Sequence, residues 1–279
     1  MNTPCTAVAT LASGGASLRA PAGDIAPEHW QGGAINCGAC CYADLRARPD
    51  ELGCEPGHAC MQDVYARRID RFFRWHPTLG DAQLAHPYFE VRAIAARHAS
   101  VFRLTAMIDD PDETVRLQIA LRLPLAQLLR LANDPHREVR LRVAQRLAPA
   151  ALAVLRDDPD YGVRELVALR LPLAILSTMA RDPDRAVRMR VAQRLEMPAL
   201  LGMAQDAEPE VRRIVAERLP APLLPCLLKD PHWRVRWEVA QRADAVTLNA
   251  LRDDEDAEVR QTVRERQMSD VTQIGVAHG

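Results

Sequence analysis

The sequence is poor in the residues that build sheets and in any long apolar segment. Aromatic residues make up only 4% of the chain, and Lys229 is the only lysine. Scarce aromatic and β-branched residues beside abundant Ala and Leu favour helices packed through aliphatic side chains. No apolar run approaches the roughly 18 residues that a membrane-spanning helix needs. The formal net charge of −1 gives no reason to expect nucleic acid or an acidic membrane as a partner.

Motifs of catalysis and export are also missing. The sequence has no P-loop, G-x-G-x-x-G, H-E-x-x-H or G-x-S-x-G pattern, and its 8 histidines are scattered. Residues 1–28 lack an early basic region and are rich in Ser, Ala, Gly and Pro, so we expect a disordered leader rather than a signal peptide. These absences predict a cytoplasmic protein that is not an enzyme, with no membrane anchor and no evident small-molecule substrate.

A 24-residue repeat dominates the rest of the chain. A Val-Arg pair recurs every 24 residues without insertions. Four other positions, occupied by Asp, Ala, Leu and a second Arg, recur with the same spacing. The first residues of the Val-Arg pairs are Val91, Val115, Val139, Val163, Val187, Val211, Val235 and Val259. A fixed period of this length indicates a stack of similar supersecondary units.

One unit, residues 110–133, reads DPDETVRLQIALRLPLAQLLRLAN. Asp110 is predicted to be the N-cap of a helix, with Pro111 at the first helical position and Glu113 two residues later. Pro124 ends this helix after about thirteen residues, because the residue before a proline is disfavoured in a helix. The roughly eight to ten residues that remain allow only a short α-helix or 3₁₀ helix. The repeat therefore predicts an all-α solenoid of alternating long and short helices.

The arginine of each Val-Arg pair lies on the core side of a helical wheel. One interpretation pairs it with the recurrent Asp or with a neighbouring carbonyl, because a partly buried charge needs a partner. The other is a groove that binds anions or nucleic acid. Acidic and basic residues are nearly balanced in the repeats, and no aromatic column is present to stack bases. We favour structural pairing, a protein as the partner, and nucleic acid as the less favoured one.

Five of the 7 cysteines lie in the stretch CGACCYADLRARPDELGCEPGHAC, residues 37–60. Cys37 and Cys40 form a C-x₂-C pair, which places two thiols on one turn facing the same metal centre. Cys54 and Cys60 would complete four ligands from the other side of the loop. In a reducing compartment such a cluster indicates a metal site rather than disulfides.

Two questions about this site stay open on spacing alone. Cys41 competes with Cys40 for one ligand position, because consecutive residues point apart, and the C-x₂-C spacing favours Cys40. Zinc held by four cysteines, or by three and His58, fits the spacing as well as an iron–sulphur cluster does.

The repeat pattern D-P-x-x-x-V-R-x-x-V-A-x-R-L-P-x-x-x-L-x-x-L resembles the unit of the leucine-rich repeat variant (LRV) family. The cysteine stretch resembles the small iron–sulphur domain that precedes such repeats, so the resemblance covers residues 37 to about 266. It implies α-helices alternating with 3₁₀ helices in a right-handed superhelix. It also implies a 4Fe–4S cluster bound by four cysteines, for which we assign Cys37, Cys40, Cys54 and Cys60; zinc stays the alternative that the spacing leaves open.

We expect four segments along the chain, and a function in binding. The segments are a leader at 1–28, an iron–sulphur domain at 29–62, a capping helix and linker at 63–86, and a solenoid of about eight repeats at 87–279, the last one degenerate. The expected function is a scaffold that binds a macromolecular partner through its superhelical surface, with the cluster structural or sensing oxygen or iron status. An electron-transfer protein and a nucleic-acid-binding solenoid are the alternatives.

Overall fold

The computed structural model describes residues 25–46 and 52–276, with side chains described as far as residue 269. Within these residues every regular element is a helix, and only isolated β-bridges occur besides. The chain separates into two compact units, Met1–Leu147 and Ala148–Gly279. The predicted all-α repeat is confirmed in both. Most of the expected leader, residues 1–24, lies outside the described residues.

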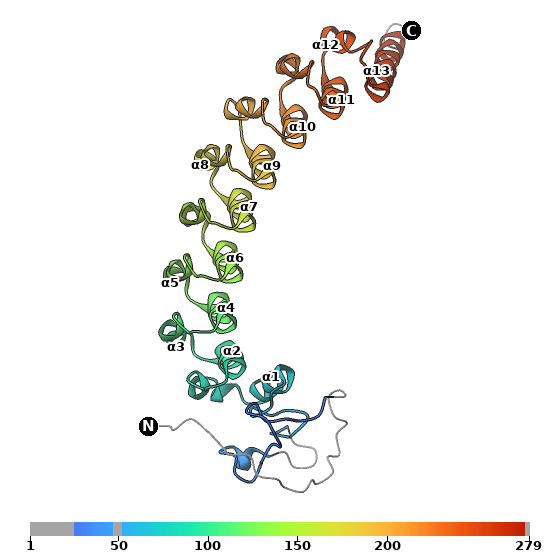
Figure 1. The fold of residues 1–279 in the computed structure, drawn as a ribbon. Coiled ribbons are helices and arrows are strands. Elements are labelled where there is room, and N and C mark those ends of the chain that lie inside the picture. Colours follow the sequence, from blue (N-terminus) through green and yellow to red (C-terminus); the bar gives the residue numbers. More distant parts are fainter. Residues whose placement is uncertain (1–24, 47–51, 277–279) are drawn as a thin grey trace. The chain divides into compact units, whose positions relative to one another are not determined.

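In the first unit, long helices pack one on the next, and short helical segments connect them (Figure 1). The long helices are α1 (Ala66–Trp75), α2 (Phe89–His98), α4 (Glu113–Arg122) and α6 (Arg137–Arg146). The short segments are η1 (Ala43–Leu45), η2 (Pro77–Leu79), η3 (Asp81–Gln83), α3 (Val101–Leu104), η4 (Thr105–Met107), α5 (Leu125–Leu128) and η5 (Leu129–Leu131). A one-turn α-helix that continues as a 3₁₀ helix matches the space the period leaves.

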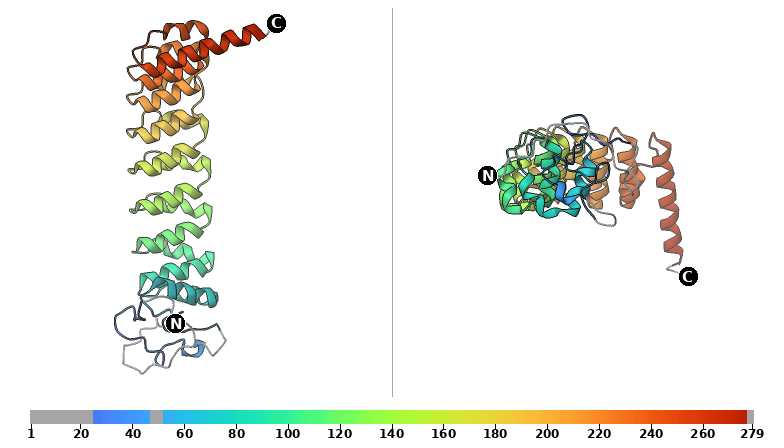
Figure 2. Two further views of the ribbon diagram at one scale, coloured as in Figure 1. Left: turned by 90° about the vertical axis from the view of Figure 1, so that its right-hand side faces the viewer. Right: turned by 90° about the horizontal axis from the view of Figure 1, so that it is seen from below.

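The second unit continues the same alternation, with its long helices stacked side by side (Figure 2). The long helices are α7 (Tyr161–Arg170), α9 (Arg185–Arg194), α10 (Pro209–Arg218), α11 (Trp233–Arg242) and α13 (Ala257–Val276). The short segments are η6 (Pro149–Leu155), α8 (Leu173–Leu176), η7 (Ser177–Met179), η8 (Ala199–Met203), η9 (Ala221–Leu227) and α12 (Ala245–Ala250). The last helix, α13, has 20 residues where the others have 10, so it departs from the repeat.

The start of each long helix differs from the sequence prediction. In α4 the N-cap is Asp112, whose carboxylate accepts the N–H of Thr114 at 2.8 Å. Asp110, the predicted cap, instead accepts the N–H of Asp112 at 3.0 Å. The prediction was wrong because the Asp-Pro pair forms a turn before the helix, which leaves α4 with 10 residues. Its end is as predicted, with Leu123 extended before Pro124.

The core of the array is built from repeat columns. Val115, Ile119, Ala120, Leu123 and Leu128 are all 0% exposed. Burying a Val, Leu or Ile side chain of this kind contributes ~1.5–3 kcal/mol. Since each repeat supplies the same set of buried positions, the stabilisation recurs once in every repeat.

Helix α1 joins the cysteine-rich segment to the repeats. Its Phe72 and Phe73 are 0% exposed and belong to one hydrophobic cluster with Cys54, Cys60 and Val91 of α2. A segment of about 35 residues cannot bury enough surface for a core of its own. The cysteine-rich segment therefore shares the core of the first repeat through α1, which packs on α2.

We predict a clear effect of substituting Gly80, which packs against the end of α2. A Cβ at this position would lie 2.9 Å from the backbone N of Ala99 and 3.1 Å from the carbonyl O of Ala95. Gly80→Ala should therefore destabilise the first unit by ~1–3 kcal/mol, because backbone atoms must move to admit the methyl group. Gly202→Ala is the matched control, since no atom lies within 4 Å of its Cβ position. Urea unfolding of both variants checks this, and equal midpoints would contradict it.

Candidate metal centre and the arginine columns

The four predicted ligands lie on two segments that the backbone holds together. Cys37 and Cys40 precede η1, and Cys54 and Cys60 precede α1. The N–H of Cys54 donates to the carbonyl of Leu45 at 2.7 Å, and Arg46 forms an isolated bridge with Cys54. These contacts join the two ends of the loop whose residues 47–51 lie outside the described part of the chain.

A tight turn brings Cys54 and Cys60 close together. Glu55 and Ala59 exchange backbone hydrogen bonds of 2.7 and 2.8 Å, and Gly57 between them has φ of +78°. Only glycine adopts this angle without strain. Cys54 is 7% exposed and Cys60 is 2% exposed. A hydrogen bond with Cys54, followed by burial, holds the pKa of the Cys60 thiol well above its usual range.

Cys37 and Cys40 lie nearer to solvent and are both half-buried. Burial, followed by the proximity of Cys60, raises the pKa of Cys37, while Arg46 acts to lower it. The Sγ of Cys40 accepts the N–H of Tyr42 at 3.5 Å. Cys41 is exposed. An amide donor directed at Sγ suits a thiolate ligand of a cluster, and the choice between Cys40 and Cys41 stays a prediction.

The donor set fits a four-iron cluster in its chemistry. No disulfide joins the described cysteines, and their surroundings combine the amide donor of Tyr42 with apolar walls from Met61 and Phe72. Within residues 25–46 and 52–276, no three His, Cys, Asp or Glu side chains form a compact ligand group. The structure thus brings Cys54 and Cys60 together with Cys37 near them, and the full set of four ligands stays a prediction.

The ring of His58, the ligand proposed for a zinc site, is engaged elsewhere. Its Nδ1 lies 3.1 Å from Nη1 of Arg71, and the same guanidinium donates to the His58 carbonyl at 2.7 Å. The ring also packs on Trp75, with 5.4 Å between centroids. A cation beside the ring disfavours a second cation on it. These contacts argue against His58 as a metal ligand.

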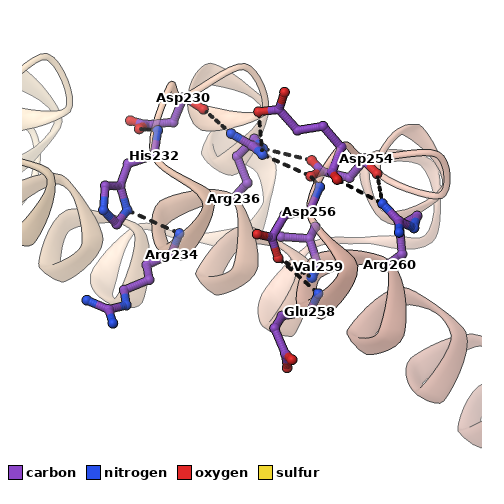
Figure 3. Close-up of polar contacts among 10 residues, drawn as sticks. Asp230, His232, Arg234, Arg236, Asp254, Asp256, Glu258, Val259 and Arg260 are labelled. Atoms are coloured by element: carbon purple, nitrogen blue, oxygen red, sulfur yellow. Dashed lines mark hydrogen bonds and ion pairs between the residues drawn. The ribbon is translucent and has the colours of Figure 1, made fainter.

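The first arginine column pairs each repeat with the next. Arg116 donates from Nε and Nη2 to the two carboxylate oxygens of Asp134 at 2.7 and 3.1 Å. Its Nη1 donates to the carbonyl of Asp110 at 2.7 Å. The Arg116 and Asp134 side chains are only 10% and 2% exposed. The same bidentate pair is formed by Arg92–Asp110, Arg164–Asp182, Arg188–Asp206, Arg212–Asp230 and Arg236–Asp254, the last shown in Figure 3.

The second arginine column binds carbonyl groups of the preceding repeat. Arg122 donates from Nη1 to the carbonyls of Ala96 and Ala99 at 2.6 and 2.8 Å, at the end of α2. Its equivalents Arg146, Arg194, Arg218, Arg242 and Arg266 make the same contact with the alanine 26 residues earlier. Helix ends leave such carbonyls without intrahelical partners. The structural interpretation of the first column is confirmed for these pairs, and the structure shows that the second column is structural as well.

One member of the first column, Arg68, was not predicted from the sequence. Arg68, one period before Arg92, is 0% exposed and forms a buried ion pair of 3.0 Å with Asp63. It also donates to the carbonyls of Ala26 and Ile25, so these residues of the expected leader are bound to the domain. His86 takes the place of the Asp that Arg68 would otherwise meet. Extending the period one step toward the N-terminus would have found both Arg68 and His86.

Comparison with known proteins agrees with this geometry. Residues 27–82 match the family described as LRV protein FeS4 cluster, and residues 89–112 and 161–184 match the family described as leucine rich repeat variant. A solved structure, titled a leucine-rich repeat variant with a novel repetitive protein structural motif, is 47% identical to this chain with a TM-score of 0.71. The match covers 76% of this chain and 91% of that chain. This chain belongs to the leucine-rich repeat variant family.

The match to the FeS4 domain includes all five clustered cysteines of this LRV protein, and the four-iron cluster is the cofactor of that domain. A relative in Rhodobacter capsulatus, the "Uncharacterized 27.7 kDa protein in nifB 3′ region", is 50% identical over 101 residues. That match spans 36% of this chain and 40% of the relative. Among the described residues, no helix combines the length and apolar character needed to cross a membrane.

Proposed function

We propose that this iron–sulphur repeat protein is a scaffold without catalytic activity, which binds a partner protein through the exposed face of its short helices. The observation that carries the proposal is the composition of these segments in the second unit. None of them contains a charged residue, and Val246, Val154 and Leu173 are 83%, 53% and 43% exposed. The uncharged segments are Pro149–Leu155, Leu173–Met179, Ala199–Met203, Ala221–Leu227 and Ala245–Ala250. Recurrent exposed apolar side chains favour contact with another protein.

The arginine columns support a protein over nucleic acid as the partner. Phosphate recognition requires guanidinium groups that face solvent. In the pairs described above, both columns donate instead to carboxylates and carbonyls between repeats, and the Arg116 side chain is 10% exposed. The nucleic-acid alternative would therefore depend on scattered surface residues.

We propose a structural role for the cluster, combined with a sensing role. Cys54 and Cys60 lie in the hydrophobic cluster that includes α1, so binding of the cluster would order the cap of the first repeat. Cys37 and Cys40 lie partly at the surface, where oxidants can reach them. The same surface position favours electron transfer as the second candidate. Reversible reduction by dithionite at an accessible potential would support electron transfer, whereas loss of the cluster in air with release of the partner would support sensing.

The partner surface is tested by placing charge on it. Leu173→Glu combined with Val246→Glu should weaken partner binding about tenfold or more, because desolvating a carboxylate opposes apolar contact. Leu169→Glu on α7 is the matched control, since Leu169 is 50% exposed but lies on a long helix. Partners retained by the wild type are identified by quantitative affinity purification, and their affinities are then measured by calorimetry.

The proposal is contradicted if the control loses the partner and the double variant keeps it. Co-purification of nucleic acid that salt releases steeply would instead favour the nucleic-acid alternative.

A further inference from the structure

The last arginine of the first column, Arg260 in α13, keeps its backbone contacts but has no carboxylate partner among the described residues. Its Nη1 donates to the carbonyls of Asp254 at 2.6 Å and Glu255 at 2.9 Å. Arg236 makes the equivalent contact with Asp230 at 2.7 Å and also holds the carboxylate of Asp254 (Figure 3). Among the side chains described, those of residues 25–46 and 52–269, no acceptor meets Nε or Nη2 of Arg260. The position one period beyond Asp254 is His278, outside the described residues.

The Nε and Nη2 donors of Arg260 are already oriented to bind a carboxylate. In each of the six bidentate pairs, the arginine donates from Nη1 to a backbone carbonyl of the preceding turn. It also donates from Nε and Nη2 to the two carboxylate oxygens of the aspartate, at 2.6 to 3.1 Å. Arg260 makes the same carbonyl contacts, so its planar guanidinium is fixed in the same way. An acceptor therefore requires little further loss of side-chain freedom.

Arg264 adds a second positive charge beside Arg260. Arg264 stands where other repeats have the buried alanine exemplified by Ala240, which is 0% exposed, and Arg264 itself is exposed. Residues four apart on a helix share one face. Two neighbouring acids are engaged elsewhere, because Asp256 accepts the N–H groups of Glu258 and Val259, and Glu265 accepts from Gln261.

We propose that Arg260, with Arg264 beside it, binds a carboxylate of a partner protein that docks on α13 as a following repeat would. A second copy of this chain cannot readily supply that carboxylate, because the aspartates of the column are themselves held in the bidentate pairs. The occupant is an acidic turn of another protein, because Arg260 and Arg264 present positive charge side by side. The inference deepens the proposed function and rests on it, since it assigns the chemistry that the partner presents at this end.

The probe is a synthetic peptide of residues 227–250, which carries this chain's own Asp230 turn and helix, with an Asp230→Asn peptide as its matched control. The ¹⁵N-labelled full chain is titrated, and the Nε–H resonance of Arg260 is followed by NMR. We expect the Asp peptide to shift this resonance and to bind about tenfold or more tightly than the Asn peptide, because a bidentate charge-assisted pair is lost in the control. Arg260→Gln should abolish the difference.

Arg260→Lys separates geometry from charge. It keeps the cation and one donor but lacks the planar fork, so the preference for the Asp peptide should largely disappear. Circular dichroism checks that both variants are folded. Equal binding of the two peptides, or an unchanged preference in Arg260→Gln, would overturn the inference. A resonance that responds to a short oligonucleotide but not to the Asp peptide would overturn it in favour of a phosphate ligand.

The full-length Arg260→Gln variant distinguishes this inference from the broader proposal. If the natural partner is retained by Arg260→Gln but lost from the Leu173→Glu, Val246→Glu variant, the carboxylate site is refuted and the scaffold role stands. If the natural partner is lost from Arg260→Gln and kept by Arg252→Gln, a change at an arginine whose side chain is 63% exposed and lies outside the proposed site, the bidentate site is supported directly.

Discussion

Replacing Asp134 with alanine is expected to destabilise the first unit by ~3–5 kcal/mol, because it leaves a buried arginine without its counter-ion. Arg116 contacts both oxygens of Asp134, and that contact raises the pKa of Arg116 above its usual value, so the side chain stays charged. The Asp134 carboxylate also accepts the N–H of His136 at 2.8 Å, which closes the turn before α6, so the substitution removes this hydrogen bond as well. The substitution therefore removes the link between two repeats and the turn that starts α6.

Urea unfolding followed by circular dichroism measures this effect. Asp109→Ala in the same unit is the control, because Asp109 lies 3.9 Å from Arg130 and their side chains are 91% and 53% exposed. A pair this exposed contributes less than ~1 kcal/mol. A double variant that replaces Arg116 and Asp134 with Met and Leu should recover much of the loss, since the unpaired charge is gone. Equal destabilisation by Asp134→Ala and Asp109→Ala would contradict the structural role of the column.

Replacing Cys54 or Cys60 with serine is expected to abolish the cluster. Anaerobically purified wild type should contain about four iron and four sulphide per chain, and the serine variants should contain almost none. The reason is geometric, since the turn at Gly57 holds these two buried thiols side by side. Loss of the cluster should also loosen α1, because both cysteines belong to its hydrophobic cluster.

Iron, acid-labile sulphide and zinc contents, together with the visible absorption spectrum, check this prediction. Cys226→Ser is the control, since Cys226 is exposed and lies in η9 of the other unit. Comparing Cys40→Ser with Cys41→Ser decides which of the adjacent cysteines is a ligand, and we expect only the first to lose the cluster. One zinc per chain, with no sulphide, would contradict the prediction.

The repeat array was predictable because its information is local and repeated. The helix-ending proline and the apolar columns recur at a fixed period along the array. One sequence therefore shows several times which residue type each position of the repeat requires. The length left after the first helix excluded a second long helix. Leu128 and Ala120, placed in the apolar columns by the pattern, are both 0% exposed in the structure.

The helix starts and the partners of the arginines needed the structure. Both Asp110 and Asp112 are good caps by residue type, and only the backbone path shows that the first closes a turn while the second caps α4. The period likewise showed that Arg116 needs a partner. It did not decide between the Asp of its own repeat and the Asp 18 residues ahead, because that choice depends on how far one repeat is displaced from the next.

By itself the sequence determined the helical repeat, the cysteines that can bind metal and the resemblance to the LRV family, since composition and spacing fix these. Tertiary structure alone decided which groups meet. It placed Cys54 beside Cys60, paired the buried Arg68 with Asp63 in place of His86, and left Arg260 with a donor pair and no carboxylate in the described part of the chain. Whether a charged side chain of a repeat is buried or exposed depends on the segment that packs against that repeat. This is decided by neighbours in space and not by neighbours in the sequence.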